Sequence, residues 1–434
     1  MQQTVHRPSS LGGTLSVPGD KSISHRSLLL NGMAQGEALV TGLSGGDDVR
    51  STMHCLQAMG VEFETGLEPG TVTVRAPAHG LQEPADILDA GNSGTSMRLL
   101  SGVLASQPFL SVLTGDGSLR SRPMGRVVQP LKQMGAQIMG RKEDSLAPFS
   151  IRGGELRGIE YTMPVASAQV KSCIMLAAVS AQQETILHQP ALSRDHTERM
   201  LTAMGATVEA DGLTLIVHPA QLHAIDIAVP GDISSAAFWL VAGLCHPNAR
   251  ILIRGIGLNP SRTGIVEALQ QMGAGSSLTL VDERMEGGEP VADMLVTSGQ
   301  LSGIEIGGDI IPRILDEVPI LAVAACFASG TTVIRDAAEL RVKESDRIDT
   351  TVAELTRLGA RIEAREDGMV IHGTGRLSGG HCQSHSDHRL AMALGVAGLL
   401  ADGETSVADS DAATVSYPEF WDHLSLLAQG GGPE

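Results

Sequence analysis

The chain has 434 residues, of which 42% are hydrophobic and 18% charged, and its formal net charge is −18. This length suffices for two or three hydrophobic cores at about 150 residues each. The acidic balance and the few aromatic residues (six Phe, two Tyr and two Trp) argue against a nucleic-acid-binding protein.

The N-terminus and the cysteines indicate where the protein works. Met1–Pro8 has no cationic region followed by an apolar stretch, and apolar runs such as 320–328 are too short to span a bilayer. The five cysteines are odd in number and never form a Cys-x-x-Cys pair. We therefore expect a cytoplasmic protein with reduced thiols and no membrane partner.

In chain order, the first expected element is a strand at residues 13–17, ended by Pro18-Gly19. An apolar helix begins near Lys21. A second helix around Leu56 ends in a glycine suited to a left-handed backbone, and an alternating strand at 61–64 follows it.

This succession recurs along the whole chain. The motif Leu-x-x-Met/Leu-Gly-Ala/Val occurs five times, starting at Leu56, Leu131, Leu201, Leu269 and Leu355. The apolar helices with polar or small-residue starts begin near Lys21, Asn92, Ser167, Asp232, Asp316 and Asp387. The two series predict six repeats of about 72 residues, with the strand at 13–17 completing the last one.

The two kinds of element predict how each repeat is layered. Helices such as 236–245 and 320–328 are apolar on nearly every side and should be buried. The strands alternate, so one face of each sheet should meet water. We therefore expect an α/β (α+β) fold with helices inside and sheets outside, the reverse of a doubly wound fold.

The tetrapeptide Val-Pro-Gly-Asp occurs at 17–20 and again at 229–232. Because Pro-Gly interrupts regular elements, we interpret these segments as crossovers between two domains. The prediction is a contiguous domain at 19–230 and a discontinuous domain formed by 1–18 with 231–434, each holding three repeats.

Basic residues gather at the starts of the helices, where free N–H groups and the helix dipole already favour anions. They are Lys21, Arg26, Arg98, Arg120, Arg122, Lys171, Arg194, Arg199, Lys343, Arg347 and Arg389. Any one of them could be a solvated surface charge, but recurrence in nearly every repeat favours an anion-binding cleft. Two carboxylates lie in the same places, Asp316 and Glu344, so the pattern indicates proton transfer on anionic substrates, although each could also be a cap or an ion-pair partner.

No metal or other cofactor is implied. His381, Cys382, His385 and His388 are close in sequence but lack a second ligand cluster or a zinc-site spacing. The chain also contains none of the common nucleotide, dinucleotide, zincin or hydrolase signatures.

Six segments in order resemble one family, the EPSP synthases. They are Pro18–Arg26, Gly91–Arg98, Arg120–Met124, Ser167–Gln169, Arg341–Arg347 and Asp387–Arg389. The resemblance covers the whole chain and points to a divergent bacterial-type branch. It implies a two-domain inverse α/β barrel of six βαβαββ repeats, with a cleft that closes on substrate.

The implied activity is transfer of the enolpyruvyl (carboxyvinyl) group of phosphoenolpyruvate to the 5-hydroxyl of shikimate 3-phosphate, with release of phosphate through a tetrahedral intermediate. This is a step of the shikimate pathway towards chorismate and the aromatic amino acids, and family members are targets of glyphosate. The implied partners are these two small molecules, with no nucleic acid, and the expected state is a monomer.

The resemblance also assigns roles to residues. Lys21, Ser22 and Arg26 would hold the shikimate ring, Lys343 would support its hydroxyls, and Lys21 would also reach phosphoenolpyruvate. The 3-phosphate would bind to Ser167, Ala168, Gln169 and Arg194, and phosphoenolpyruvate to Gly94, Arg122, Arg347, His388 and Arg389. Asp316 would accept the 5-hydroxyl proton and Glu344 would protonate the methylene carbon, so the expected catalytic residues are Asp316, Glu344 and Lys21.

The chain departs from some family members at two positions. Ala168 replaces a second Ser, and Val415 stands where some members carry a Lys, so the partners of the departing phosphate stay open among Arg122, Lys343, Arg347 and Arg389. Two alternatives also stay open: an enolpyruvyl transferase acting on UDP-N-acetylglucosamine, and a non-catalytic anion-binding homologue. No Cys lies between Cys55 and Cys173, where the first would carry one, and the second would not need both Asp316 and Glu344.

Overall fold

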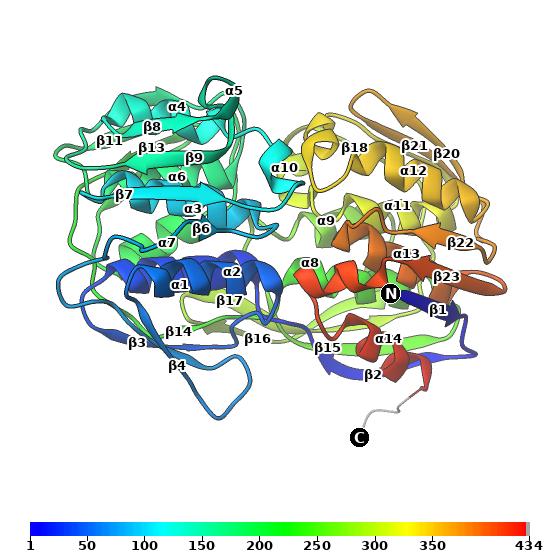
Figure 1. The fold of residues 1–434 in the computed structure, drawn as a ribbon. Coiled ribbons are helices and arrows are strands. Elements are labelled where there is room, and N and C mark those ends of the chain that lie inside the picture. The colour runs from blue at the N-terminus through cyan, green and yellow to red at the C-terminus, as the bar shows by residue number, and fades with distance from the viewer. Residues whose placement is uncertain (431–434) are drawn as a thin grey trace. The chain divides into compact units, whose positions relative to one another are not determined.

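The computed structural model describes residues 1–430, which divide into two compact units (Figure 1). Unit 1 consists of Met1–Asp20 together with the chain from Pro230 onward, and unit 2 is Lys21–Val229. Each unit has its own hydrophobic core.

Unit 2 contains three repeats in which short strands and two main helices alternate. Its first repeat has α1 (Lys21–Met33), β3 (Glu37–Thr41), α2 (Asp47–Ala58), β4 (Glu62–Thr65) and β5 (Val72–Arg75). The second has β6 (Leu88–Asp89), α3 (Gly94–Ala105), β7 (Leu110–Thr114), a 3-10 turn η1 (Leu119–Ser121), α4 (Gly125–Met134), β8 (Gln137–Gly140), the short α5 (Arg141–Asp144) and β9 (Leu146–Arg152). The third has β10 (Glu160–Thr162), α6 (Ala168–Ala178), β11 (Thr185–His188), α7 (His196–Ala203), β12 (Val208–Asp211) and β13 (Thr214–Val217), and β14 (Ile227–Ala228) follows.

Unit 1 repeats the pattern. Its first two strands are β1 (Gln2–His6) and β2 (Leu11–Ser16), and after the return of the chain come α8 (Ile233–Cys245), β15 (Ala249–Gly257), α9 (Gly264–Gln271), η2 (Gly275–Ser277), β16 (Leu278–Glu286) and β17 (Glu289–Thr297). The next repeat has β18 (Glu305–Ile306), η3 (Gly308–Ile310), α10 (Ile311–Ile314), α11 (Val318–Phe327), β19 (Gly330–Ile334), η4 (Ala338–Val342), α12 (Arg347–Arg357), β20 (Arg361–Arg365) and β21 (Gly368–Gly373). The last has β22 (His381–Gln383), α13 (His388–Leu400), β23 (Glu404–Ala408), η5 (Ser410–Val415) and α14 (Phe420–Ala428).

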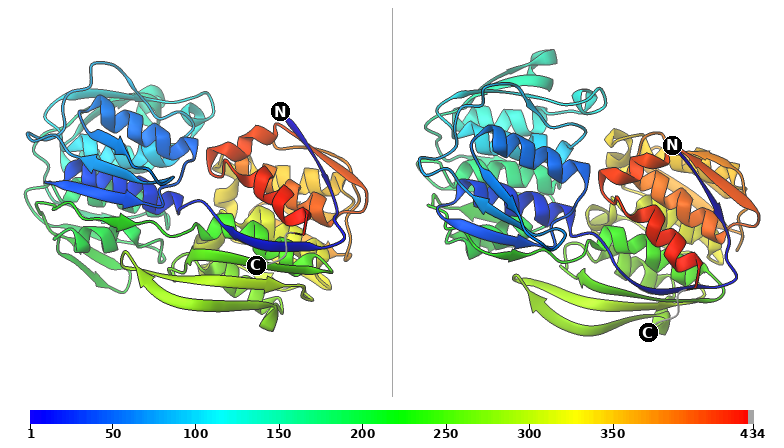
Figure 2. Two further views of the ribbon diagram at one scale, coloured as in Figure 1. Left: turned by 90° about the horizontal axis from the view of Figure 1, so that it is seen from below. Right: turned by 60° about the horizontal axis from the view of Figure 1, so that its bottom comes forward.

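Residues 1–430 form six separate sheets, one for each repeat. In unit 2 the strand orders are β14-β3-β5-β4, β6-β7-β9-β8 and β10-β11-β13-β12, and in unit 1 they are β16-β17-β15-β2, β18-β19-β21-β20 and β1-β23-β22. The expected repeat architecture is therefore present. The sheets do not close into barrels. The expected inverse barrel therefore describes only how the separate sheets surround the helices of each unit (Figure 2).

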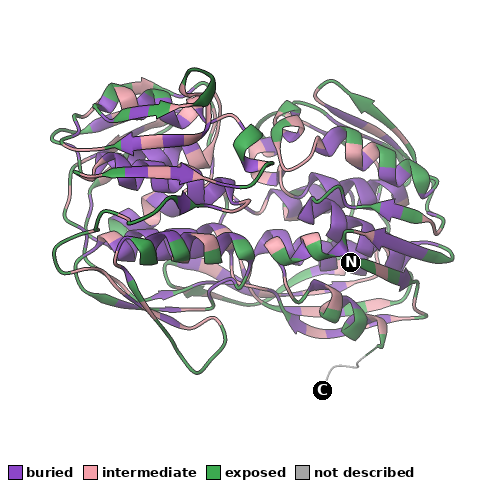
Figure 3. Ribbon diagram, viewed as in Figure 1, coloured by how far each residue is buried: buried purple, intermediate pink, exposed green. Residues whose placement is uncertain are grey.

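The helices that were expected to be buried form the core of each unit. Every residue of α13 is buried, as is nearly every residue of α1, α3, α8 and α11 (Figure 3). The glycines of the five recurring motifs all have a positive φ, between +82° at Gly359 and +116° at Gly135. This confirms the predicted left-handed helix ends, which a residue with a Cβ adopts less readily.

One strand assignment was wrong. The strand at 13–17 was expected to complete the last repeat, but β2 pairs in parallel with β15, in the first sheet of unit 1. The last repeat is completed by β1, which pairs antiparallel with β23. The error has a physical reason, because β1 buries only Val5 and shows no alternating pattern.

The two Val-Pro-Gly-Asp segments lie against each other in unit 1. The Asp20 amide donates to the Pro230 carbonyl at 2.7 Å, and the Asp232 amide donates to the Pro18 carbonyl at 2.9 Å. The side chain of Arg262 then pairs with Asp232 at 2.7 Å and Asp20 at 3.5 Å. The two tetrapeptides thus form an isolated antiparallel bridge at Gly19 and Gly231, and one buried arginine pairs with the aspartates of both.

Two further features concern helix length and the state of the cysteines. Among the described residues, no helix is long and apolar enough to cross a bilayer. All five cysteines are free, and burial raises the pKa of the Cys55 thiol to about 12.

Candidate active site

In unit 2 the polar starts of the buried helices carry most of the predicted site residues. Two of these starts are capped by serine: the Ser93 hydroxyl accepts the Ser96 amide before α3, and the Ser167 hydroxyl accepts the Val170 amide before α6. Gly94 and Ala168 are the first residues of these two helices. The caps leave neighbouring N–H groups at the positive end of each helix dipole, which suits an anion.

Arg26 lies on α1, and Arg194, from the loop before α7, reaches the start of that helix. The buried Arg26 guanidinium donates to the Thr197 hydroxyl at 2.7 Å, to the Ser172 hydroxyl at 2.6 Å and to the Ser22 carbonyl at 2.8 Å. Arg194 donates to the Ser22 hydroxyl at 3.2 Å. The structure therefore brings Ser22, Arg26 and Arg194 together, with Arg26 already held by neighbouring polar groups.

A second cluster joins α3 and α6. Arg98 donates to the side-chain oxygen of Gln169 at 2.7 Å, and the Gln169 amide donates to the Thr95 hydroxyl at 2.9 Å. A Cβ on Gly94 would lie 2.7 Å from Arg98 and 3.2 Å from Arg122. A side chain here would therefore have to displace the ends of two arginine side chains, so glycine allows both guanidinium groups to approach the backbone.

Lys21 and Arg122 have partners that the sequence analysis missed. The Lys21 ammonium pairs with Asp48 at 2.9 Å, and both side chains are largely buried. Arg122 donates to the side-chain oxygen of Asn92 at 2.7 Å. Asp48 gave little signal because an acidic residue at the start of a helix is ordinarily a dipole partner.

In unit 1 one arginine gathers the predicted acid and base. The buried Arg347, at the start of α12, donates to Glu344 at 2.7 Å and to Asp316 at 3.4 Å. Its Nε donates to the fully buried Asp387 at 2.8 Å. Burial opposes the charge of Arg347, but these three carboxylates outweigh it and raise the pKa of the guanidinium above its ordinary value.

Two further cations of unit 1, Lys343 and Arg389, have their charges compensated less completely than Arg347. Burial lowers the pKa of the Lys343 ammonium, and the Asp316 and Glu339 carboxylates only partly oppose it. An anion beside Lys343 would favour its charged form. Arg389 is almost completely buried, and its Nε and Nη1 have no hydrogen-bond partner among residues 1–430. Since such groups are costly to leave unsatisfied, Arg389 is suited to bind an anion.

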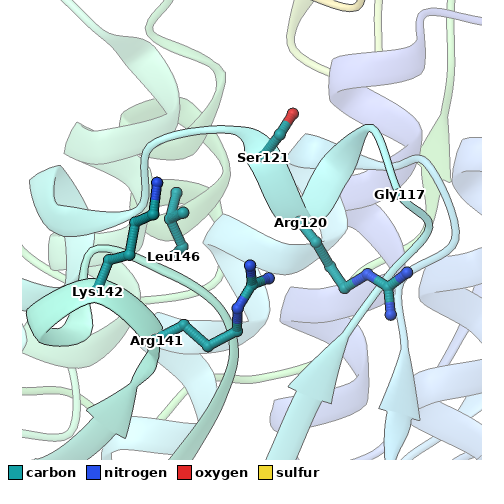
Figure 4. A pocket seen from close by; sticks show the side chains of 6 residues that line it. All are labelled: Gly117, Arg120, Ser121, Arg141, Lys142 and Leu146. Atoms are coloured by element: carbon teal, nitrogen blue, oxygen red, sulfur yellow. The ribbon is translucent and has the colours of Figure 1, made fainter.

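A cavity in unit 2 is lined by none of the predicted site residues. It has a volume of about 470 Å³ and is lined by Gly117, Arg120, Ser121, Arg141, Lys142 and Leu146, from η1, α5 and the residues beside them (Figure 4). Arg120 belongs to the basic residues noted in the sequence, but its neighbour Arg122 is the one that turns inward to Asn92.

In the histidine-rich segment, His381 and His385 form hydrogen bonds with other residues of the protein. His381 bonds to the Ser406 hydroxyl, and His385 pairs with Glu354 at 2.9 Å. Across the part of the chain that the structure describes, no group of three or more His, Cys, Asp or Glu residues is placed to hold a metal ion.

Two solved structures define the class of the protein. An EPSP synthase from Acinetobacter baumannii is 44% identical, with a TM-score of 0.87 and 98% of both chains covered. An enolpyruvyl transferase from Streptomyces tendae is only 18% identical, with a TM-score of 0.80 and 98% and 96% coverage, and it supports the fold alone. The fold is thus that of the two-domain enolpyruvyl transferases.

Sequence comparison narrows the class to one family. The model of the EPSP synthase (3-phosphoshikimate 1-carboxyvinyltransferase) family matches residues 5–424. A 3-phosphoshikimate 1-carboxyvinyltransferase from Gloeobacter violaceus is 56% identical over 422 residues, which cover 96% of this chain and 97% of the relative. The chain belongs to the EPSP synthase family, and the resemblance seen in the six motifs is confirmed.

Proposed function

We propose that the protein is a transferase that moves the enolpyruvyl group of phosphoenolpyruvate to the 5-hydroxyl of shikimate 3-phosphate and releases phosphate. Family membership over nearly the full chain is the observation that carries this function. It favours shikimate 3-phosphate over UDP-N-acetylglucosamine as the acceptor. The reaction belongs to aromatic amino acid biosynthesis.

Shikimate 3-phosphate is assigned to residues of unit 2 and to Lys343. Lys21, Ser22 and Arg26 hold the ring, and the 3-phosphate binds to Ser167, Ala168, Gln169 and Arg194. The polar clusters around Arg26 and Gln169 support this assignment, because they hold these side chains before the ligand arrives. Such preorganisation reduces the entropy that binding must lose.

Phosphoenolpyruvate is assigned to Gly94, Arg122, Arg347, His388 and Arg389, with Lys21 also within reach. The available Nε and Nη1 of Arg389 support the assignment, since a carboxylate or phosphate would satisfy both. Phosphate leaves from the same group of cations, among which Arg122, Lys343, Arg347 and Arg389 are the candidates because the chain has Val415 near its C-terminus.

The proposed reaction has two stages. Asp316 accepts the proton of the 5-hydroxyl as its oxygen bonds to C2 of phosphoenolpyruvate, while Glu344 gives a proton to the methylene carbon. The resulting phosphate ketal then loses phosphate and a methyl proton, which restores the carbon–carbon double bond on the acceptor. Cations around the developing charge and the positioning of both substrates lower the barrier.

The remaining assignments concern the organisation of the protein. We propose a monomer that works in the cytoplasm and needs neither a metal nor a nucleotide. The two domains are proposed to be 19–230 and 1–18 with 231–434, close to the bounds of the two compact units.

Release of phosphate tests the proposed function. Purified protein should release phosphate only when phosphoenolpyruvate and shikimate 3-phosphate are both present, and chelation of divalent metals should leave the rate unchanged. Release from phosphoenolpyruvate alone, or with UDP-N-acetylglucosamine as the only acceptor, would contradict it.

A further inference from the structure

A segment of unusual backbone geometry precedes the start of α13. His385 has φ +54° and Ser386 has φ +57°, two consecutive left-handed residues that are not glycine. Residues with a Cβ adopt this conformation only when their surroundings enforce it. The residues that follow are Asp387, which binds Arg347, and then His388 and Arg389.

One side of this segment is held by a buried carboxylate on α12. Glu354 is only 1% exposed, and it accepts a hydrogen bond from the Gln383 amide at 3.0 Å while pairing with His385 at 2.9 Å. Arg357 contributes a longer contact at 3.4 Å from an exposed position. The carboxylate thus fixes the backbone at Gln383 and the side chain of the first left-handed residue.

The other side of the segment is held by hydroxyl and amide groups. Ser384 donates to the Asp409 carbonyl at 3.0 Å and accepts the Ser386 amide at 3.2 Å. The Gln383 side chain donates to the Asp409 carboxylate at 2.9 Å. None of these contacts involves the His385 side chain. Among the described residues, Glu354 is the only carboxylate that pairs with it.

Glu354 and Arg347 belong to the same buried face of α12. They are about two helical turns apart, and both are buried together with Thr351. Arg347 holds Asp387 while Glu354 holds His385, so one helix face fixes both ends of the segment that leads into α13.

We propose that Glu354 is a positioning residue for phosphoenolpyruvate, acting through the left-handed pair His385-Ser386. By holding this pair, it sets where α13 begins and therefore where the His388 and Arg389 side chains lie. The inference rests on the proposed function, which assigns these two residues to phosphoenolpyruvate. Glu354 itself touches no substrate.

The variant Glu354→Gln keeps the size of the side chain but replaces one acceptor oxygen with an NH₂ group, so one of its two close donors loses its acceptor. We expect kcat/KM for phosphoenolpyruvate to fall about tenfold, within the range for a hydrogen bond to a charged group. The KM for shikimate 3-phosphate should stay within about twofold, because its proposed ligands lie elsewhere. Glu363→Gln is the matched control, since Glu363 is exposed and, among residues 1–430, pairs only with Arg365, at 3.1 Å.

A second substitution separates positioning from loss of stability. Ser386→Gly removes the cost of one left-handed residue, so the segment should keep its course with fewer restraints. The double variant Glu354→Gln/Ser386→Gly should therefore regain a clear part of the lost kcat/KM for phosphoenolpyruvate. If Glu354 had a purely structural role, kcat/KM would fall by the same factor for phosphoenolpyruvate and for shikimate 3-phosphate, in proportion to the folded fraction of the protein.

The outcomes are distinguishable. An active wild type with Glu354→Gln indistinguishable from Glu363→Gln would overturn the role of Glu354 alone, as would equal losses for both substrates or a double variant no better than the single one. A wild type that releases no phosphate from the two substrates would overturn the proposed function, and this role with it.

Discussion

Arg347 pairs with both carboxylates that are proposed to transfer protons. Asp316 and Glu344 occupy different donors of its guanidinium, and Asp387 occupies the remaining side. Because Asp387 is completely buried and also caps α13, it anchors Arg347 while the other two carboxylates stay partly exposed. Asp316 and Glu344 are therefore the two carboxylates of this cluster that remain partly accessible to solvent.

Amide substitutions test whether the two carboxylates have separate roles. Asp316→Asn and Glu344→Gln keep the shape of each side chain but remove its proton-transfer group, so kcat should fall by about 10² to 10⁴ in each variant. Asp316→Asn should also weaken shikimate 3-phosphate, whereas Glu344→Gln should leave its KM unchanged. Steady-state rates of phosphate release measure both effects.

Hydrogen exchange distinguishes the acid from the base. In deuterated solvent with shikimate 3-phosphate present, the wild type should exchange the methylene hydrogens of phosphoenolpyruvate, and Glu344→Gln should suppress this exchange in the NMR spectrum. If Glu344→Gln exchanges and turns over like the wild type, Glu344 is only an ion-pair partner of Arg347.

The sequence identified the cations of the site better than their partners. A basic residue at a polar helix start has a recognisable pattern, as at Lys21 and Arg347. Asn92 and Asp387 were recognised as helix starts, but their pairing with Arg122 and Arg347 was not, and Asp48 was not singled out at all. Such pairings depend on packing, and no local pattern specifies them. The assignment of site residues to substrates stays a prediction.

At the scale of elements, Arg262 links the two crossover segments. It is only 3% exposed and pairs with Asp232 and Asp20, and its Nη2 also donates to the Ser234 hydroxyl at 2.7 Å. Burial opposes its charge, yet the neighbouring carboxylates raise the pKa of its guanidinium. The arginine thus neutralises two aspartates that could not otherwise be buried at low cost.

Arg262→Gln should destabilise the protein by about 3–5 kcal/mol, because it leaves buried carboxylates without a counter-charge. The thermal unfolding midpoint should fall by roughly 4 °C. Arg254→Gln is the control, since Arg254 lies exposed on β15 and a substitution there should change stability by no more than about 0.5 kcal/mol. Calorimetry measures both, and equal midpoints for the two variants would show that the crossover does not depend on Arg262.

The helices were easier to predict than the strands. Helices such as α11 and α13 are apolar all round, and the glycines after Leu56 and Leu131 mark helix ends, so both features are local. The two-residue strands β6 and β14 have too few residues for any alternation. Their pairing with β7 and β3 is decided by the packing of the repeat.

At the scale of the whole molecule, the internal repeat was the most informative feature of the sequence. It predicted six sheets around buried helices because each repeat must bury its apolar helix against its neighbours. It could not predict which N-terminal strand completes the last repeat. Both β1 and β2 belong to unit 1, and they differ only in the strands with which they pair.

Transfer of a labelled carbon tests the central claim most directly. Phosphoenolpyruvate labelled with ¹³C at C2 is incubated with shikimate 3-phosphate and the purified protein, and the products are followed by NMR. The label should appear in an enol ether on the 5-oxygen of the acceptor, with one phosphate released for each ether formed. Label found only in pyruvate, or left in phosphoenolpyruvate while the acceptor is unchanged, would contradict the proposed transfer.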